Sequence, residues 1–413
     1  MNRVLMFSLF FSVVLSAFGL MQYRLYRLYR RWVRNSFDRP SQSQWLKRAK
    51  VILLLSNIHF LSRFFLSDLG IHEHPLSQVF MVYPGGMFFA IIIFSFLIVS
   101  ARDLLAFLRW LAKTVARRMG HITDSSSREI AVMDAGRRRF LRLSGMSVAS
   151  VIGSIPVVAS AATARDYQIH RVPLHFDNLP SALNGFTIAQ VSDIHAGLYM
   201  TEKNMREIFE LTNSLQAAMI MVTGDFVDNT DSQILPLYKA IEMLRAAYGI
   251  FGCLGNHDHF ATAEKVAAAM RGRNIEMLNN SHRTLSVNGA QLSIIGIDDA
   301  GRGKSNFADL GRALDGLNHD SFKVMLTHRP DVFPQCVKLG MDLTLAGHTH
   351  GGQVGFQLGP LNLNPVYLIH KYAMGHYVEG GKHLYVNVGV GMVGVPIRMV
   401  KPEISLFTLH PSR

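Results

Sequence analysis

Five short apolar runs between residues 188 and 346 each end in a polar motif, and this repeated arrangement limits the folds open to the chain. Runs of three to five residues that are rich in Val, Ile and Leu and end at a polar turn are typical of buried β-strands. The runs are Ile188–Val191, Met219–Val222, Ile250–Leu254, Val324–Leu326 and Leu343–Ala346. Because the carboxyl ends of such strands meet at one edge of a sheet, we expect the five motifs to converge in a crevice there.

The five motifs contain side chains of the kinds that bind metal ions. They are Asp193-Ile194-His195, Gly224-Asp225-Phe226-Val227-Asp228, Gly255-Asn256-His257-Asp258, His328-Arg329-Pro330 and Gly347-His348-Thr349-His350-Gly351-Gly352. In an extended backbone, positions i and i+2 project from the same side. We therefore expect Asp193 and His195 to bind one cation together, and His348 and His350 to project together in the same way. Gly224 permits a sharp turn before Asp225.

Seven of these residues are candidate metal ligands: Asp193, His195, Asp225, Asn256, His328, His348 and His350. A mixture of nitrogen and oxygen ligands suits Mn, Fe or Zn and argues against an all-oxygen Mg or Ca site. A carboxylate has two oxygens and can bridge two cations, and we expect Asp225 to do so. A single buried histidine is more often structural than a ligand, but seven candidates at five strand ends favour a metal site.

Two divalent cations about 3.5–4 Å apart can activate a water molecule and bind phosphoryl oxygens, so the motifs indicate hydrolysis at phosphorus. His257 is next to Asn256 and is not needed as a ligand, so we expect it to protonate the leaving oxygen or stabilise charge there. Asp228 could orient this imidazole and favour its charged form, or it could cap its loop. For five further polar residues, contact with substrate and a structural role both remain open: Asp258, His259, Asp298, Asp299 and Arg329.

The ordered series DxH, GDxxD, GNHD, HxP and GHTH resembles the calcineurin-like metallophosphoesterase superfamily over about residues 185–400. The resemblance implies a four-layer α/β/β/α sandwich with two facing sheets. It also implies one metal ion bound by Asp193, His195, Asp225 and His350, and a second bound by Asp225, Asn256, His328 and His348. The last motif, Gly347-His348-Thr349-His350-Gly351-Gly352, and the basic and apolar residues 1–164 that precede the domain are similar to the membrane-associated branch related to YkuE-type phosphoesterases.

Residues 165–413 alternate strand-like and helix-like runs, which predicts an α/β domain. Helical periodicity predicts helices over Thr201–Leu215, with Thr201 as its cap, over Ile234–Ala247 and over Ala261–Met270. Asn288-Gly289 predicts a hairpin between two strands. We interpret the apolar stretches Leu361–Ile369 and Val388–Val400 as closing strands, with an apolar lip that faces the bilayer as the alternative.

Residues 1–164 form a different region, which we predict to be an α-helical membrane region. They contain 21 Lys and Arg against 7 Asp and Glu, whereas residues 165–413 contain 21 against 22, so the net charge of +13 belongs to the first part. The basic residues lie between apolar stretches, which is typical of membrane proteins and not of a nucleic-acid interface. Four stretches approach the roughly 20 residues that cross a bilayer. They are Val4–Met21, Val51–Leu69, Val79–Ser100 and Leu143–Ala162.

Basic connections stay cytoplasmic, so four spans would place both chain ends outside the inner (cytoplasmic) membrane and make the catalytic domain extracytoplasmic. The segment Arg137–Arg142 resembles a twin-arginine signal, which implies the twin-arginine export machinery as a partner. An ordinary basic anchor is the alternative. If Leu143–Ala162 does not insert, the domain is cytoplasmic. Arg102–Val115 has the pattern of an interfacial amphipathic helix, or it continues the third span.

The sequence therefore predicts a membrane-anchored, dinuclear-metal phosphodiesterase or phosphatase that acts on lipid or cell-envelope phosphoesters, with membrane lipids as partners. One alternative is hydrolysis of a lipid-linked pyrophosphate of the UDP-2,3-diacylglucosamine type, which relatives in the family perform and which needs a cytoplasmic site. A metal-occupied membrane sensor is the non-enzymatic alternative, and His257 with Asp228 argues against it. Cys253 and Cys336 have no metal-type spacing, and we expect both to be buried.

Overall fold

A computed structural model of the chain describes residues 3–68, 74–77, 80, 82–118, 163–301, 303–358, 361–394 and 397–412. The contacts between residues divide the chain into two compact units. One unit comprises Met1–Leu61 and Pro84–Val158, and the other comprises Ser62–Tyr83 and Ala159–Arg413. The candidate site lies in the second unit, and each unit is described by itself.

The N-terminal part of the chain forms long helices: α1 (Arg3–Ser36), α2 (Arg39–Asp68) and α4 (Tyr83–Arg118), with the short α3 (Pro75–Ser77) between the last two. Amide side chains join α1 to α2, because Gln22 and Asn57 donate hydrogen bonds to each other at 2.7 and 2.9 Å. The ring centroids of Phe18 in α1 and Phe89 in α4 are 4.8 Å apart. Each amide group therefore has a hydrogen-bond partner, which offsets the cost of placing a polar group among apolar side chains.

In the described part of the chain, one helical segment is long and apolar enough to cross a membrane. It is Pro84–Ala116, with a mean hydropathy of 2.2, and it contains most of the third predicted span. Helix α4 runs without a break to Arg118, so Arg102–Val115 continues this helix. The first two predicted spans fall on α1 and α2, whereas Leu143–Ala162 and the twin-arginine segment lie outside the described residues. The topology with four spans stays a prediction.

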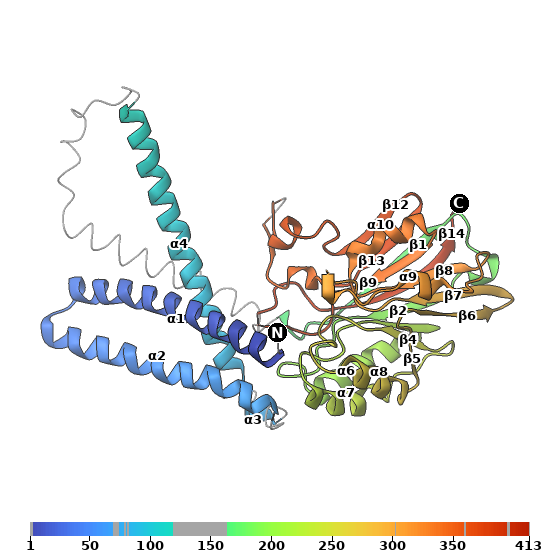
Figure 1. Cartoon of the computed structure of the whole chain (residues 1–413), viewed down its shortest axis with the longest axis horizontal. Coiled ribbons are helices and arrows are strands. Elements are labelled where there is room, and N and C mark those ends of the chain that lie inside the picture. The colour runs from blue at the N-terminus through green and yellow to red at the C-terminus, as the bar shows by residue number, and fades with distance from the viewer. Residues whose placement is uncertain are drawn as a thin grey trace. The chain divides into compact units, whose positions relative to one another are not determined.

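Two six-stranded mixed sheets form the centre of the second unit (Figure 1). The first sheet has the order β1 (Gln168–Phe176), β14 (Glu403–Pro411), β2 (Thr187–Val191), β3 (Met219–Thr223), β4 (Ile250–Cys253) and β5 (Ile275–Met277). The second has the order β12 (Gly375–Glu379), β13 (Lys382–Val386), β9 (Leu343–Ala346), β8 (Phe322–Leu326), β7 (Ala290–Gly296) and β6 (Ser281–Val287). A separate hairpin pairs β10 (Phe356–Leu358) with β11 (Leu361–Leu363). The five predicted strands are therefore divided between two sheets.

Helices cover the outer face of each sheet, which produces four layers. The first sheet packs against α6 (Glu202–Ser214), α7 (Ile234–Ile241) and α8 (Ala263–Arg271), and the second against α9 (Leu310–Leu314) and α10 (Phe333–Lys338). Strand β3 alternates between two cores. Met219 and Met221 belong to the core between the sheets, whereas Ile220 and Val222 belong to the core beneath α6 to α8. The predicted α/β/β/α sandwich is confirmed.

Most local predictions agree with the structure. The side chain of Thr201 caps α6 by accepting a hydrogen bond from the backbone N–H of Asn204. Asn288 and Gly289 have φ angles of 49° and 89°, as the predicted two-residue hairpin turn requires. Helix α7 is shorter than predicted and ends at Ile241. The side chain of Asn213 hydrogen-bonds the backbone of Met243 and Arg245, and it thereby takes groups that a longer helix would use.

The prediction of a closing strand over Val388–Val400 is wrong. The described residues of this stretch form a loop. Arg398, which belongs to this stretch, is fully buried and donates hydrogen bonds of 2.7 Å to the carbonyl oxygens of Val388 and Gly389. The guanidinium group thus satisfies backbone acceptors that a neighbouring strand would otherwise satisfy. Leu361–Ile369 is only partly a strand, because β11 ends at Leu363 and a 3-10 helix, η9 (Pro365–Leu368), follows.

Candidate metal centre

The candidate ligands lie in the loops that follow five strands, three of the first sheet and two of the second. Asp193 and His195 follow β2, Asp225 follows β3 and Asn256 follows β4. His328 follows β8, and His348 and His350 follow β9. The side chains therefore meet where the carboxyl ends of both sheets come together, rather than at the edge of a single sheet.

The backbone at the ligands is left-handed, not extended as expected. Five of the seven candidate ligands have positive φ angles between 49° and 73°: Asp193, His195, Asp225, His348 and His350. Such angles are uncommon for residues other than glycine, and they concentrate at functional sites. Alternation along a strand is therefore not what turns Asp193 and His195 to the same side. Backbone hydrogen bonds from Asp193 to Gly224 and from His195 to Asp225 position this loop.

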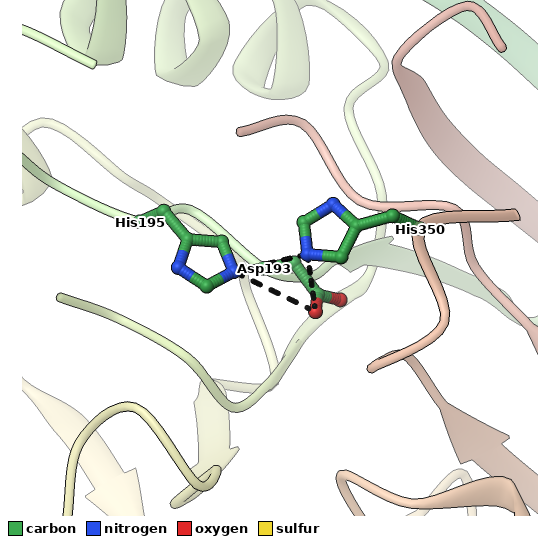
Figure 2. A group of neighbouring side chains, drawn as sticks. All are labelled: Asp193, His195 and His350. Carbon is green, nitrogen blue, oxygen red and sulfur yellow. Dashed lines mark hydrogen bonds and ion pairs between the residues drawn. The ribbon is translucent and has the colours of Figure 1, made fainter. Parts of the chain in front are cut away.

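Asp193, His195 and His350 form one group of ligand atoms (Figure 2). The Nε2 atoms of His195 and His350 are 3.0 Å apart, and Nε2 of His350 is 3.3 Å from Oδ1 of Asp193. Nε2 of His195 is 4.0 Å from the same carboxylate oxygen. All three side chains are buried, and Figure 2 shows both rings turned toward the carboxylate. Atoms at these separations can bind one metal ion together.

Asp225 lies between this group and a second set of imidazoles. Its Oδ2 atom is 3.5 Å from Nε2 of His195 and 3.1 Å from Nε2 of His328. Nδ1 of His348 is 3.2 Å from Nε2 of His328. One carboxylate therefore contacts candidate ligands of both proposed ions, as a bridging ligand must.

Asn256 and the buried imidazoles fit a bound cation. The Oδ1 atom of Asn256 is buried without a hydrogen-bond partner, which costs about 1–3 kcal/mol unless an ion or another group satisfies it. The next residue, His257, donates its backbone N–H to Oδ1 of Asp225 at 2.8 Å, so Asn256 is held beside the centre. Its neutral amide oxygen complements the carboxylates and imidazoles as a ligand of first-row divalent ions.

Burial and neighbouring positive groups favour the neutral form of two histidines, and the neutral imidazole is the form that binds metals. Burial, and then the neighbouring His195, hold the pKa of His350 well below its usual range. Burial, together with His328 and Arg329, lowers the pKa of His348 to about 2. His328 behaves differently: burial disfavours its charge, but Asp225 outweighs this effect and raises the pKa to about 10. The carboxylate and the imidazole ring of that pair attract each other strongly.

His257 and Asp228 form a pair at the rim of the centre. Nδ1 of His257 is 3.5 Å from Oδ1 of Asp228, and the same oxygen is 3.6 Å from Nδ1 of His195. Burial lowers the pKa of His257, but its contacts with Asp228 outweigh burial and raise it to about 9. Burial likewise opposes the charge of Asp228, but hydrogen bonds from the two histidines lower its pKa to about 2. A partly exposed imidazolium in this position can donate a proton.

Two motif glycines allow backbone segments to approach the carboxylates closely. A Cβ atom at Gly347 would lie 2.2 Å from Oδ2 of Asp193, and one at Gly255 would lie 2.3 Å from Oδ1 of Asp225. Gly224 has a φ of 83°, in agreement with the sharp turn expected before Asp225. A side chain at any of these positions would displace a candidate ligand.

The sequence argument missed Ser192 and Arg398, which support the ligands, and for Arg329 it left open both a contact with phosphate and a structural ion pair. Ser192 donates a hydrogen bond to Oδ2 of Asp193 at 2.6 Å. Arg329 forms an ion pair with Asp299 at 2.7 Å, and its Nη1 atom is 2.9 Å from Nε2 of His348. The position of Arg329 directly after His328 was the only signal for it. Arg398 supports the loop whose Gly391 N–H bonds the carbonyl oxygen of Asp193.

The remaining polar residues of the motifs have structural partners. The carboxylate of Asp258 accepts hydrogen bonds from the backbone N–H groups of Phe226, Val227 and Gly255, so it holds two ligand loops together. His259 pairs with Asp298 at 2.8 Å. Cys253 and Cys336 are buried and free, as predicted.

Comparison with known proteins identifies the family. A family model described as calcineurin-like phosphoesterase matches residues 186–352. The metallophosphoesterase YkuE of Bacillus subtilis (strain 168) is 32% identical over 288 residues, which cover 66% of this chain and 97% of that protein. A protein of Danio rerio named transmembrane protein with metallophosphoesterase domain is 26% identical over 384 residues, 90% of this chain and 82% of its own length. The chain therefore belongs to the calcineurin-like phosphoesterase family and is a phosphoester hydrolase.

Proposed function

We propose that the chain is a membrane-anchored hydrolase that uses two divalent ions (Mn, Fe or Zn) to cleave phosphomonoesters or phosphodiesters. The observation that carries this proposal is the position of Asp225. Its Oδ2 atom is 3.5 Å from Nε2 of His195 on one side and 3.1 Å from Nε2 of His328 on the other. A single shared carboxylate between two sets of nitrogen and oxygen ligands suits a pair of ions better than one ion.

The side chains of the centre have different roles in the proposed hydrolysis. Asp193, His195 and His350 would hold one ion, Asn256, His328 and His348 the other, and Asp225 both. Such a pair supplies an activated water molecule and binds phosphoryl oxygens. His257 protonates the leaving oxygen, and Asp228 keeps its imidazole charged and oriented.

Replacement of Asp225 tests this proposal. Asp225→Ala should abolish hydrolysis of bis(4-nitrophenyl) phosphate and lower the bound metal, measured by elemental analysis, while the circular dichroism spectrum stays unchanged. Asp320→Ala, at an exposed carboxylate in the same unit, is the matched control and should retain both properties. Full activity of Asp225→Ala would contradict the assignment. Reconstitution of the metal-free protein with Mn, Fe or Zn separately identifies the ion.

For the location of the domain, we propose several membrane spans in the inner membrane with an extracytoplasmic catalytic domain, delivered by the twin-arginine machinery. The alternation of basic and apolar segments supports this topology. A cysteine placed at an exposed position, His319→Cys, tests it, because both native cysteines are buried. Labelling by a membrane-impermeant maleimide in spheroplasts is expected, and labelling only after the membrane is permeabilised would place the domain in the cytoplasm.

A further inference from the structure

An exposed apolar segment lies next to the candidate metal centre. Leu368 and Ile369 are 89% and 76% exposed, which makes them the two most exposed large apolar side chains in the described part of the chain. Tyr367 beside them is 45% exposed. Single exposed apolar residues are common on soluble proteins, but three consecutive ones beside a candidate site indicate a binding surface. We refer to Tyr367, Leu368 and Ile369 as the apolar tip.

The apolar tip is attached directly to the loop that contains two candidate ligands. Asn364, which caps η9 and is buried, donates a hydrogen bond of 2.6 Å to the carbonyl oxygen of Gly351. Thr349 donates one of 2.6 Å to the carbonyl oxygen of Ala373, on the other side of the tip. The ring of His370, which follows the tip, packs edge-on against His348 with centroids 5.9 Å apart. A molecule held by the tip therefore lies close to the metal centre.

The chemistry of the tip and its surroundings matches the surface of a lipid bilayer. Tyrosine is enriched where membrane meets water, and a lysine beside apolar residues can extend its charged end toward the headgroups. Lys371 follows the tip within two residues, and its side chain is exposed while it pairs with Glu379. Three residues cannot supply the ~800 Å² that each partner of a stable protein interface buries, so a second copy of the chain is a poor occupant.

The N-terminal part of the chain would anchor the catalytic unit to a membrane. The apolar segment Pro84–Ala116 can cross a membrane, and residues 119–162 connect α4 to the catalytic unit. Even fully extended, this connection spans on the order of 150 Å. A tether of this kind raises the effective concentration of the membrane at the tip, so that a small apolar contact suffices.

We propose that the apolar tip inserts into the membrane to which the chain is anchored, and that the metal centre hydrolyses phosphoesters of membrane lipids. This inference rests on the proposed phosphoester hydrolysis and names its substrate class. Insertion would bring lipid headgroups, which carry the phosphoester, to the rim of the centre. Acyl chains would then remain in the bilayer while the headgroup is cleaved.

Fluorescence quenching tests insertion without reference to activity. Both native cysteines are buried, so a cysteine introduced at Leu368 can be labelled selectively with bimane in the full-length chain. The protein is reconstituted in vesicles of phosphatidylcholine and phosphatidylglycerol. A label at Leu368→Cys should be quenched by lipids brominated on their acyl chains, whereas one at Leu235→Cys, an exposed position on α7, should not. Quenching of the Leu368 label by aqueous iodide alone would overturn insertion. Quenching that rises with the number of protein molecules per vesicle, and not with the content of brominated lipid, would also overturn it.

Activity on two substrates tests the substrate class. The double variant Leu368→Ser/Ile369→Ser leaves no cavity, since both side chains are exposed. It should lose about tenfold or more in hydrolysis of phosphatidylglycerol and phosphatidic acid in vesicles, and keep hydrolysis of soluble bis(4-nitrophenyl) phosphate within about twofold. An equal effect on both substrates, or none on either, would overturn this proposal. Failure of the wild type to hydrolyse the soluble ester would instead contradict the proposed function. The quenching experiment would still test membrane insertion, because it does not depend on activity.

Discussion

The Nε2 atoms of His195 and His350 face each other at 3.0 Å in the buried centre. Two imidazoles cannot both direct a hydrogen at the other across this distance, and burial with His195 lowers the pKa of His350. The Nδ1 atom of His350 has no hydrogen-bond partner, and that of His195 is 3.6 Å from Oδ1 of Asp228. The site is therefore costly for the protein alone, and a cation would relieve that cost.

Removal of metal should consequently destabilise the fold. A ligand that binds only the native state at 1,000 times its dissociation constant stabilises that state by about 4 kcal/mol. For a domain of this size, we expect chelation to lower the unfolding midpoint by on the order of 10 °C, measured by calorimetry. His350→Ala should unfold at a temperature that responds far less to added metal, whereas the exposed His319→Ala should respond like the wild type. An equal response from both variants would contradict the assignment of His350.

Replacement of His257 should slow the reaction without loss of metal. General acid catalysis contributes typically 10²–10⁴-fold, and it matters most when the leaving group is a poor one. His257→Ala should therefore reduce turnover by about 10²-fold for an alkyl phosphoester, and much less for a nitrophenyl ester, whose leaving oxygen needs no proton. Steady-state kinetics with both esters and elemental analysis measure these effects. A parallel loss of bound metal would show that His257 is a ligand instead.

A methyl group at Gly347 should damage the centre. It would lie 2.0 Å from Oγ of Ser192 and 2.2 Å from Oδ2 of Asp193, so either the loop or the carboxylate must move. We expect Gly347→Ala to lose at least about 2 kcal/mol of unfolding free energy and to bind metal more weakly. The control is Gly311→Ala in α9, where Cβ meets nothing closer than 3.4 Å. That variant should be neutral or more stable by about 0.5–1 kcal/mol. Denaturant titration and metal titration measure the two effects.

His383 in β13 should make stability depend on pH. Burial, and then His376, lower the pKa of His383 to about 4, although Asp177 and Asp342 oppose this shift. In the unfolded chain the same ring titrates near pH 6.5, so the unfolded state takes up the proton first as the pH falls. The contribution of a neutral His383 is complete above about pH 6.5 and is lost between there and about pH 4.

His383→Phe should keep the ring contact with Phe176 and remove this pH dependence. One titrating proton changes the unfolding free energy by at most about 1.4 kcal/mol per pH unit. We therefore expect the variant to show a shallower loss of stability between pH 6.5 and 4.5 in urea titrations. The exposed His319→Ala should follow the wild-type profile, and a His383→Phe profile with the wild-type slope would refute the assignment.

The sequence alone determined the strands and the kinds of ligand. Runs such as Met219–Val222 are too apolar to be exposed and have the length and composition of buried strands, and the structure confirms β3 there. The chemistry of Asp, Asn and His side chains is a property of the residue and needs no coordinates. Periodicity and capping residues likewise predicted α6, since they act within a few residues along the chain.

Only the tertiary structure decided which of these side chains meet. His195 faces His350, and Arg329 joins Asp299 to His348, through contacts between segments that no local spacing relates. The same is true of Arg398, whose burial turned an expected strand into a supported loop. Left-handed backbone at the ligands also depends on distant neighbours, because that strain persists only where surrounding contacts outweigh it. Local sequence encodes short-range preferences, whereas the position of one loop against another depends on how two whole sheets pack.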